Sequence, residues 1–470
     1  MGSGLIQLLA IGQQDIYLKL NPSLTFFKKV FKTHSNFSVE TISVEMNRTD
    51  VLVNDNTTFK IKIPRHGDLM AQIYFTIDLP DIISDNVISF RWIKNLGEAL
   101  IDNYYITIGG NLIDKQYGQF MHVMNELSLS ETKKKLYGKL IGNTTDLNNP
   151  ETYALEKQNL PISTLRYRVG RTYPIGNPGF PNYKFFQPSI PTRRLYIPLY
   201  FWFNRDYGNA LPLVSLQYSD VELTIVTRPI TELYQLYYSK NGTQDYWAPD
   251  PTNSQHNLFN FVRNDRVTYM STHTVLDTKA HLEINYVYLD NLERSYFAYK
   301  PVEYLITQTT QINLSDMQNT NIYNLTLQNP VTEFIWFIQR SDVALRNDWF
   351  NYTDPNYVSI MKQAKIMFNG IDRMDLKEAN YFNYLQPWQH TTANSVPGLY
   401  LYSFSLFPEE YQPSGSFNAS RINNIQLYLT ANTPVDQDVK KGITYQGVLY
   451  VINYNFLKIA SGIGGPVFAS

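Results

Sequence analysis

Apolar and polar residues alternate along several short stretches of the chain. The pattern is clearest in Val39–Met46, Phe59–Ile63, Ala71–Leu79 and Tyr104–Ile108. A period of two places every second side chain on the same face, which is typical of a strand with one buried face. The pattern therefore predicts an all-β protein built from short strands.

Helical periodicity is confined to short segments bounded by Asn, Gly, Pro or Ser, so we expect helices only as insertions in the loops between strands. Turn signals are dense, and Gly109-Gly110 and Asn369-Gly370 each lie where a tight hairpin is expected. The candidate helices are Pro22–Lys32, Tyr117–Leu127, Glu131–Leu140 and Leu376–Tyr384.

The most informative feature is an internal repeat at an offset of 399 − 195 = 204 positions. A repeat of about 200 residues indicates duplication of a whole domain, because solenoid repeats are far shorter. Many short strands in each copy favour a jelly roll of eight strands. The matched positions are Leu195-Tyr196 with Leu399-Tyr400, Phe203 with Phe407, Tyr207 with Tyr411, and Val221, Leu223 and Ile225 with Ile425, Leu427 and Leu429.

These patterns predict two tandem eight-stranded jelly rolls with short helices inserted in loops. We place the domain boundary near Arg228-Pro229 and expect a surface loop at Ser239–Asn264, where Asn, Asp, Gly, Pro and Thr are frequent. Both ends of the chain are expected to be arms that become ordered against neighbouring molecules. The expected divisions are an N-terminal arm at 1–22, a first jelly roll at 23–229, a second at 230–457 and a C-terminal tail at 458–470.

Composition restricts the possible partners, cellular compartment and surfaces of the protein in three ways. The 470 residues carry 40 basic and 41 acidic side chains, so no charge excess for direct nucleic-acid binding is present. The chain has no cysteine, which excludes disulfides and thiolate metal sites and suits a reducing compartment. Aromatic residues make up 14% of the chain, with 36 Tyr, which favours broad contact surfaces.

Candidate chemistry is sparse, and we predict neither catalytic residues nor cofactor or metal ligands. The seven histidines lack the spacing that places two ligands on one face. Glu409-Glu410 is expected to shape a loop or an interface, and Lys133-Lys134-Lys135 to form the solvated face of a helix. The segment Pro22–Lys32 could face a partner or a membrane, but packing beneath the first jelly roll is favoured.

Nine Asn-X-Ser/Thr sequons occur, and in a chain rich in Asn, Ser and Thr many arise by chance. Residues Met1–Ala10 lack a positively charged start and a long apolar run, so no secretory signal is expected. Most sequons are therefore expected to carry no glycan. Asn241, within the expected surface loop, is the best glycosylation candidate.

Several segments resemble, in order and over nearly the whole chain, the major capsid proteins of nucleocytoplasmic large DNA viruses. The block with the most specific spacing contains Pro408-Glu409, Gln412–Gly415, Asn418 and Ser420–Ile422. Val302 departs from the pattern, where a histidine is expected, and this bears on a local contact only. The similar segments are Leu8–Phe37, Ile101–Glu126, Leu211–Tyr218, Tyr288–Ile306, Asn329–Trp336 and Phe404–Leu427.

The resemblance implies a structural shell protein and not an enzyme. It further implies a homotrimer of near-hexagonal outline, contacts with neighbouring capsomers and with minor capsid and penton proteins, and an icosahedral virion capsid over an inner membrane, assembled in the host cytoplasm. Two alternatives stay open at this point. One is a minor capsid or scaffold paralogue of the same fold, and the other is a double jelly-roll carbohydrate-binding or glycan-processing protein.

Overall fold

The computed structural model describes residues 2–46, 53–82, 88–150, 173–175, 185–187, 190–240, 242–262, 278, 280–317, 319–393, 395–432 and 442–468. The chain divides into two compact units, Met1–Phe37 and Ser38–Ser470. Among the described residues no helix is both long and apolar enough to cross a bilayer.

The first unit contains two short helices, α1 (Ser3–Leu9) and α2 (Gln13–Lys19), neither with a buried residue. The helix expected at Pro22–Lys32 is not formed, which corrects that prediction. Within this unit Phe27 is 99% exposed and Phe31 is 85% exposed, and the expected packing of the segment beneath the first jelly roll stays a prediction. Residues 22–32 contain Thr25, Val30 and three Phe residues, which favour a helix less than the Leu and Gln residues of α1 and α2 do.

Two antiparallel sheets form the first jelly roll. Alternation produces them directly: in β2 every second residue is buried, from Thr57 to Ile61. The inner faces of both sheets meet in one core that includes Phe75 and Ile225. One sheet contains β1 (Phe37–Glu45), β14 (Ala280–Leu289), β3 (Leu69–Leu79), β10 (Leu211–Pro212) and β9 (Arg193–Pro198), and the other β2 (Thr57–Lys62), β11 (Val221–Thr227), β5 (Ile101–Ile108) and β6 (Asn111–Tyr117).

Two further antiparallel sheets form the second jelly roll. Their shared core includes Phe334, Trp336, Tyr400 and Leu427. One sheet contains β15 (Val302–Met317), β24 (Tyr445–Ala460), β17 (Pro330–Arg340), β21 (Leu399–Ser403), β22 (Phe417–Asn418) and β25 (Ile463–Pro466), and the other β16 (Thr320–Leu325), β23 (Ile425–Ala431), β18 (Met361–Phe368), β19 (Ile371–Asp372) and β20 (Lys377–Glu378).

The sequence repeat corresponds to equivalent strands. β9 pairs with β3 as β21 pairs with β17, and β11 lies between β2 and β5 as β23 lies between β16 and β18. The hairpins that follow β5 and β18 turn at Gly109-Gly110 and Asn369-Gly370, all four with positive φ. Two tandem jelly rolls, with helices inserted in loops, are therefore present as predicted.

Strand pairing continues the first jelly roll beyond the expected boundary at Arg228-Pro229. β14 pairs with β3 from Ala280↔Ile77 to Val287↔Leu69, so it completes the first pair of sheets. Composition could not reveal this, because β14 is separated from the strands it joins by the insertion that follows Pro229.

That insertion differs from the expected surface loop at Ser239–Asn264. It contains β12 (Tyr234–Lys240) and β13 (Thr243–Trp247), which pair with each other, and β12 also pairs with β4 (Ser89–Trp92). A further small sheet joins β7 (Tyr173–Ile175) and β8 (Phe185–Gln187).

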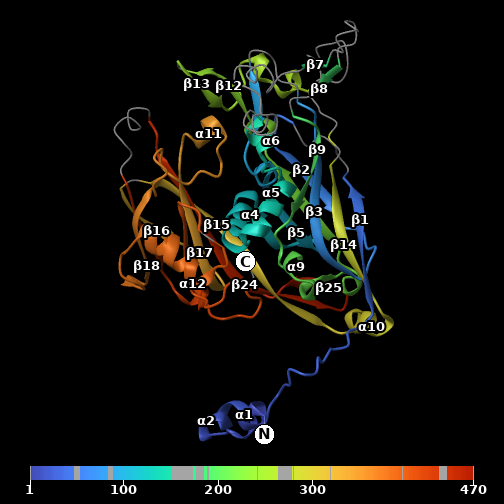
Figure 1. Ribbon diagram of the computed structural model, residues 1–470. Helices are drawn as coiled ribbons and strands as arrows, with labels where there is room; N and C mark the ends of the chain where they lie inside the picture. The colour runs from blue at the N-terminus through green and yellow to red at the C-terminus, as the bar shows by residue number, and fades with distance from the viewer. Residues whose placement is uncertain are drawn as a thin grey trace. The chain divides into compact units, whose positions relative to one another are not determined.

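Helices occupy loops, and α4 (Gly118–Ser128) and α5 (Glu131–Ile141) agree with the prediction. The helix expected at Leu376–Tyr384 instead begins as β20 and continues as a π-helical turn. Figure 1 shows α4 and α5 between the two groups of strands. The other α-helices of the described residues are α3 (Leu96–Leu100), α6 (Thr145–Asn148), α9 (Trp202–Arg205), α10 (Asn291–Tyr299), α11 (Val343–Arg346) and α12 (Gln386–His390).

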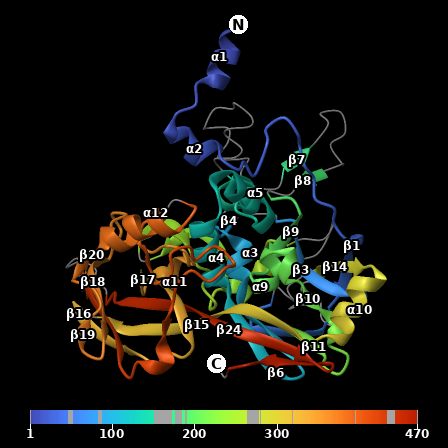
Figure 2. The ribbon, with the colours of Figure 1, turned by 90° about the horizontal axis from the view of Figure 1, so that it is seen from below.

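The C-terminal segment is a strand and not a free arm, which corrects the expectation for this end of the chain. β25 pairs with β24, and the N–H of Tyr218 donates to the carbonyl of Gly462 at 2.9 Å. The long strands β15 and β24 run from the second group of strands towards the first (Figure 2). Tyr304, Ile306, Leu457 and Ile459 at their far ends belong to the first core.

Candidate functional site

The contact between the two jelly rolls is the candidate site, and helix α4 forms much of it. Phe120, Val123 and Leu127 lie on one face of α4 and pack against Ile335 and Tyr450 of the second roll. The ring centroids of Phe120 and Tyr450 are 5.0 Å apart. At the start of α4, a Cβ on Gly118 would lie 2.0 Å from the carbonyl oxygen of Ile101, so only glycine permits this close approach. The helix is thus fixed to the first roll and buried against the second.

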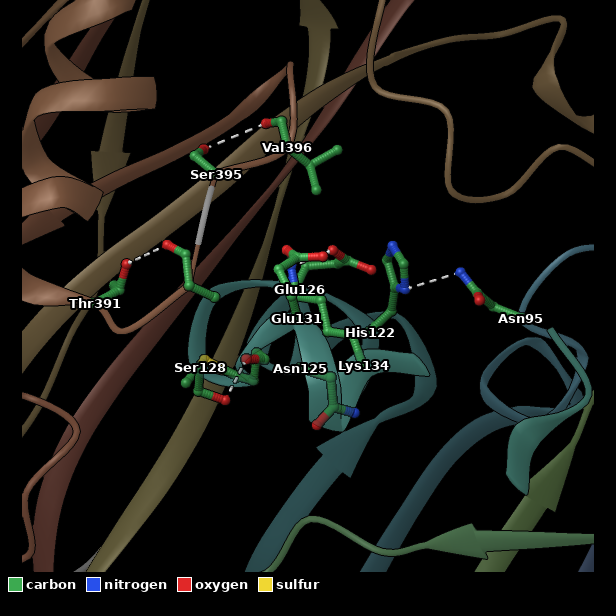
Figure 3. A network of polar contacts seen from close by, with 12 residues as sticks. Asn95, His122, Asn125, Glu126, Ser128, Glu131, Lys134, Thr391, Ser395 and Val396 are labelled. Atoms are coloured by element: carbon green, nitrogen blue, oxygen red, sulfur yellow. Dashed lines mark hydrogen bonds and ion pairs between the residues drawn. The ribbon is translucent and has the colours of Figure 1, made fainter. Parts of the chain in front are cut away.

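A buried polar network surrounds α4 on the other side of the contact. The carboxyl of Glu98, fully buried, is 2.8 Å from Nδ1 of His122 and accepts hydrogen bonds from Asn125 and Tyr137. Nδ1 of His122 also lies 3.2 Å from the side-chain nitrogen of Asn95, and Figure 3 shows these two side chains facing each other. Such a network is expected to fix the orientation of α4, because each buried polar group needs its partners.

Two buried carboxyls outside this network, those of Asp114 and Glu333, have raised pKa values. Burial raises the pKa of Asp114 to about 7, against the stabilising hydrogen bond from Gln116. Burial also raises the pKa of Glu333 to about 8, while Arg205 lowers it and Glu409 adds to the rise. A raised pKa in a cleft marks a candidate functional residue, although structural sites also show such shifts.

The described residues singled out from sequence form no hydrogen bond with Glu98, although Lys134 pairs with another residue of α4. Glu409 accepts hydrogen bonds from the backbone N–H and the hydroxyl of Thr392, so it shapes its loop as expected. Of the three lysines on α5, Lys134 forms an ion pair with Glu126 at 2.9 Å and is only 16% exposed, whereas Lys133 and Lys135 are exposed.

No group of three or more His, Asp or Glu side chains that could hold a metal ion occurs among the described residues. Asn241, the glycosylation candidate, lies outside the described residues, so it stays a prediction. Sequence reasoning missed Glu98 and His122, because they are 24 positions apart and their pairing depends on how α4 packs. The one available signal was a charged residue within an apolar run at Leu96–Ile101.

Two family models together match most of the chain. The model described as the major capsid protein N-terminus matches residues 25–290, and the model described as the large eukaryotic DNA virus major capsid protein matches residues 293–465. The two matched ranges meet just after β14, where the strand pairing of the first jelly roll ends.

Relatives and solved structures agree with these matches. The major capsid proteins of Phaeocystis pouchetii virus and Pyramimonas orientalis virus are 30% and 31% identical over the whole of both chains. A "probable capsid protein 4" of Acanthamoeba polyphaga mimivirus is 30% identical over the same extent. In fold, the Faustovirus major capsid protein has a TM-score of 0.68 at 13% identity, covering 96% of this chain and 94% of its own. VP54 of PBCV-1 has a TM-score of 0.67 at 24% identity, covering 95% and 100%.

Proposed function

This chain belongs to the family of large eukaryotic DNA virus major capsid proteins, and from that premise we propose that three copies assemble into a capsomer of near-hexagonal outline. Its relatives are named for their place in the capsid, and the chain is accordingly a structural protein of the virion and not an enzyme. The glycan-processing alternative is thereby set aside.

The observation that carries the trimer is the pair of equivalent jelly rolls within one chain. Three chains around a threefold axis present six similar faces, so cyclic symmetry combined with an internal duplication produces a six-sided tile. Tiles of that outline cover an icosahedral shell. The division we propose places the boundary between the rolls at about Asp290, after β14.

Helix α12 and the turn before it supply a candidate surface for the trimer contact. Tyr384, Leu385 and Trp388 are 56%, 41% and 80% exposed, and Tyr384 and Trp388 lie four positions apart, on one face. Aromatic side chains that are exposed on a free subunit are often those buried at the centre of an interface after the subunits associate. We therefore expect this surface to be covered by a second copy of the chain.

The mass of the purified protein tests the trimer. Three chains of 54.6 kDa amount to about 164 kDa, to be measured by light scattering together with negative-stain images. Trp388→Ala should reduce the trimer fraction, whereas Lys362→Ala, on the exposed side of β18, should not. A wild-type protein that stays monomeric at high concentration would contradict the proposal.

Further partners follow from a place in the shell. We propose contacts with neighbouring capsomers and with minor capsid and penton proteins, above an inner membrane, after assembly in the host cytoplasm. The N-terminal unit supports such contacts, because Phe26, Phe27 and Phe31 are at least 85% exposed beside Lys28 and Lys29. A minor capsid subunit is the second candidate role, because one relative is named a probable capsid protein and not a major one. The abundance of this chain in purified particles separates the two roles.

Glycosylation of Asn241 is a separate part of the proposal. Peptide mass spectrometry of virion protein should find a glycan at Asn241 that is absent after Asn241→Gln. An unmodified Asn241 peptide from virions would rule the site out.

A further inference from the structure

A cavity of about 370 Å³ lies between the two jelly rolls. The end of α4 and the segment from Tyr200 to Asn209 line it from the first roll, and strands β17 and β24 and the loop Pro408–Tyr411 line it from the second. This volume is within the range of small-molecule sites, which often lie between domains. Any occupant would therefore touch both rolls at once.

Two buried polar groups in the cavity wall have no partner among the residues that the structure describes. The side chain of Glu333 is in a residue only 5% exposed, and its carboxyl forms no hydrogen bond with a described residue. The indole N–H of Trp202, 4% exposed, is likewise unpartnered. Buried polar groups are nearly always hydrogen-bonded, so two unsatisfied groups in one cavity wall indicate the place of a ligand.

The charged side chains that line the cavity restrict the chemical class of ligand that it can bind. Four carboxyls line the cavity, from Asp206, Glu333, Glu409 and Glu410, against a single basic side chain, Arg205. The guanidinium of Arg205 already lies 4.2 Å from the ring centroid of Tyr200. An excess of carboxyls attracts a cation and disfavours an anion.

The remaining wall is apolar and aromatic. Leu305, Ile335 and Leu401 line it together with the rings of Trp202, Tyr411 and Tyr454. Aliphatic side chains suit an alkyl chain, and aromatic faces attract an ammonium group. A metal cation is disfavoured, because the carboxyls of the cavity do not form a group of three or more that could hold one among the described residues.

We propose that this cavity binds a small organic ammonium ion, whose charged nitrogen pairs with the carboxyl of Glu333 and whose alkyl chain packs against Leu305 and Ile335. The bound ligand joins the two rolls and stabilises their contact, since binding to the folded state alone raises the free energy of unfolding. This inference is independent of the proposed trimer.

Proton release gives the proposal a distinctive signature. Arg205, Glu409, Tyr200 and Tyr454 interact electrostatically with Glu333, and Asp206, Glu410 and Tyr411 line the same cavity. Burial raises the pKa of Glu333 to about 8. Pairing with an ammonium group favours the ionised carboxylate, so binding at pH 7 releases a proton. Affinity should rise by up to about tenfold per pH unit between pH 6 and 8, while the amine stays protonated.

The test uses the full chain and n-butylamine as probe, with 1-butanol and butyrate as uncharged and anionic controls of similar length. Calorimetry at pH 7 in two buffers of different ionisation enthalpy should give saturable binding with release of close to one proton. Glu333→Gln should weaken n-butylamine binding roughly 10- to 100-fold and abolish proton release. Glu303→Gln, on an exposed residue of β15 paired with Lys458, is the matched control and should bind as the wild type does.

Equal binding of 1-butanol or butyrate, unchanged affinity in Glu333→Gln, or no binding at all would each overturn the proposal. If Glu333→Gln does not fold, the wild-type protein still decides: affinity for n-butylamine that does not rise between pH 6 and 8 rejects the role of Glu333.

Discussion

Asp114 on β6 is 2% exposed, and burial raises the pKa of its carboxyl to about 7. Its neighbour Gln116 donates through its side-chain nitrogen, while the side-chain oxygen of Gln116 is buried without a partner among the described residues. Burial disfavours the charged carboxylate and outweighs the hydrogen bonds from Gln116, which favour it. The folded protein therefore favours the neutral acid.

The sign of the resulting pH dependence follows from this raised pKa. Between about pH 4 and 7 the unfolded chain releases the Asp114 proton while the folded chain retains it, so stability falls as pH rises through this window. The loss is up to about 4 kcal/mol and levels off above pH 7. Asp114→Asn cannot ionise, so urea unfolding should show a flatter slope between pH 4 and 7 and greater resistance than the wild type at pH 8.

Asp55→Asn, at an exposed loop residue, serves as the control and should unfold in parallel with the wild type. Part of the slope will persist in Asp114→Asn, because Glu333 keeps its proton over a similar range. Parallel pH profiles for Asp114→Asn and wild type would refute the assignment.

His122 supports α4 through hydrogen bonds as well as through packing. Its ring lies 4.1 Å from the ring of Phe350, and its Nδ1 is 2.8 Å from Glu98. His122→Phe keeps an aromatic ring but removes the partner of a buried carboxyl, so we expect a loss of about 2–4 kcal/mol in unfolding free energy. Adding Glu98→Gln in that background removes the charge and should recover part of the loss.

A double-mutant cycle over His122→Phe and Glu98→Gln measures this coupling by chemical denaturation. Strictly additive effects of the two substitutions would show that the hydrogen bond does not matter and that ring packing alone holds α4.

At the scale of elements, α4 connects the two rolls, chiefly through the side chain of Phe120. Phe120 is 1% exposed and lies between Tyr200 and Tyr450, at ring-centroid distances of 5.9 and 5.0 Å. Phe120→Ala should lower stability by about 3–5 kcal/mol, because the cavity opens in the contact between two rigid sheets. Leu136→Ala on α5, at a residue 59% exposed, should leave the unfolding midpoint nearly unchanged.

Elements that depend on residues close together in the sequence were predictable, and those that depend on contacts between distant parts of the chain were not. β2 and α4 follow from their own apolar periods, and the turn at Gly109-Gly110 follows from its glycines. β14 could not be assigned to the first roll, because its partner β3 is about 200 residues earlier in the chain. The helix expected at Pro22–Lys32 does not form although its pattern is amphipathic, because its Thr, Val and Phe residues favour a helix only weakly.

The candidate site divides in the same way. Glu409 was noticed because it lies in a block whose spacing is visible in the sequence, whereas Glu333 only precedes the apolar run Phe334–Ile338 of β17. Its importance depends on Glu409, from a loop of the second roll, and on Arg205, which only the contact between the rolls brings near it.

For the whole molecule, the most important feature for folding is that one end of β15 and one end of β24 reach the first roll. Tyr304 and Ile306 of β15, and Leu457 and Ile459 of β24, lie in the core of the first roll although their strands belong to the second. A first roll without these strands leaves that part of its core open to water. The first roll should then not be an independent folding unit, despite the duplication that produced the two rolls.

This gives a prediction about cooperativity. The intact chain should unfold in one transition by both near- and far-ultraviolet circular dichroism, and the isolated fragment 38–289 should fail to reach a native state. Mixing it with the fragment 290–470 should restore near-ultraviolet signal, because β15 and β24 then complete its core. Two separate transitions in the intact chain, or a stable isolated first roll, would mean that the side chains at the far ends of β15 and β24 cover the first core without being needed to form it.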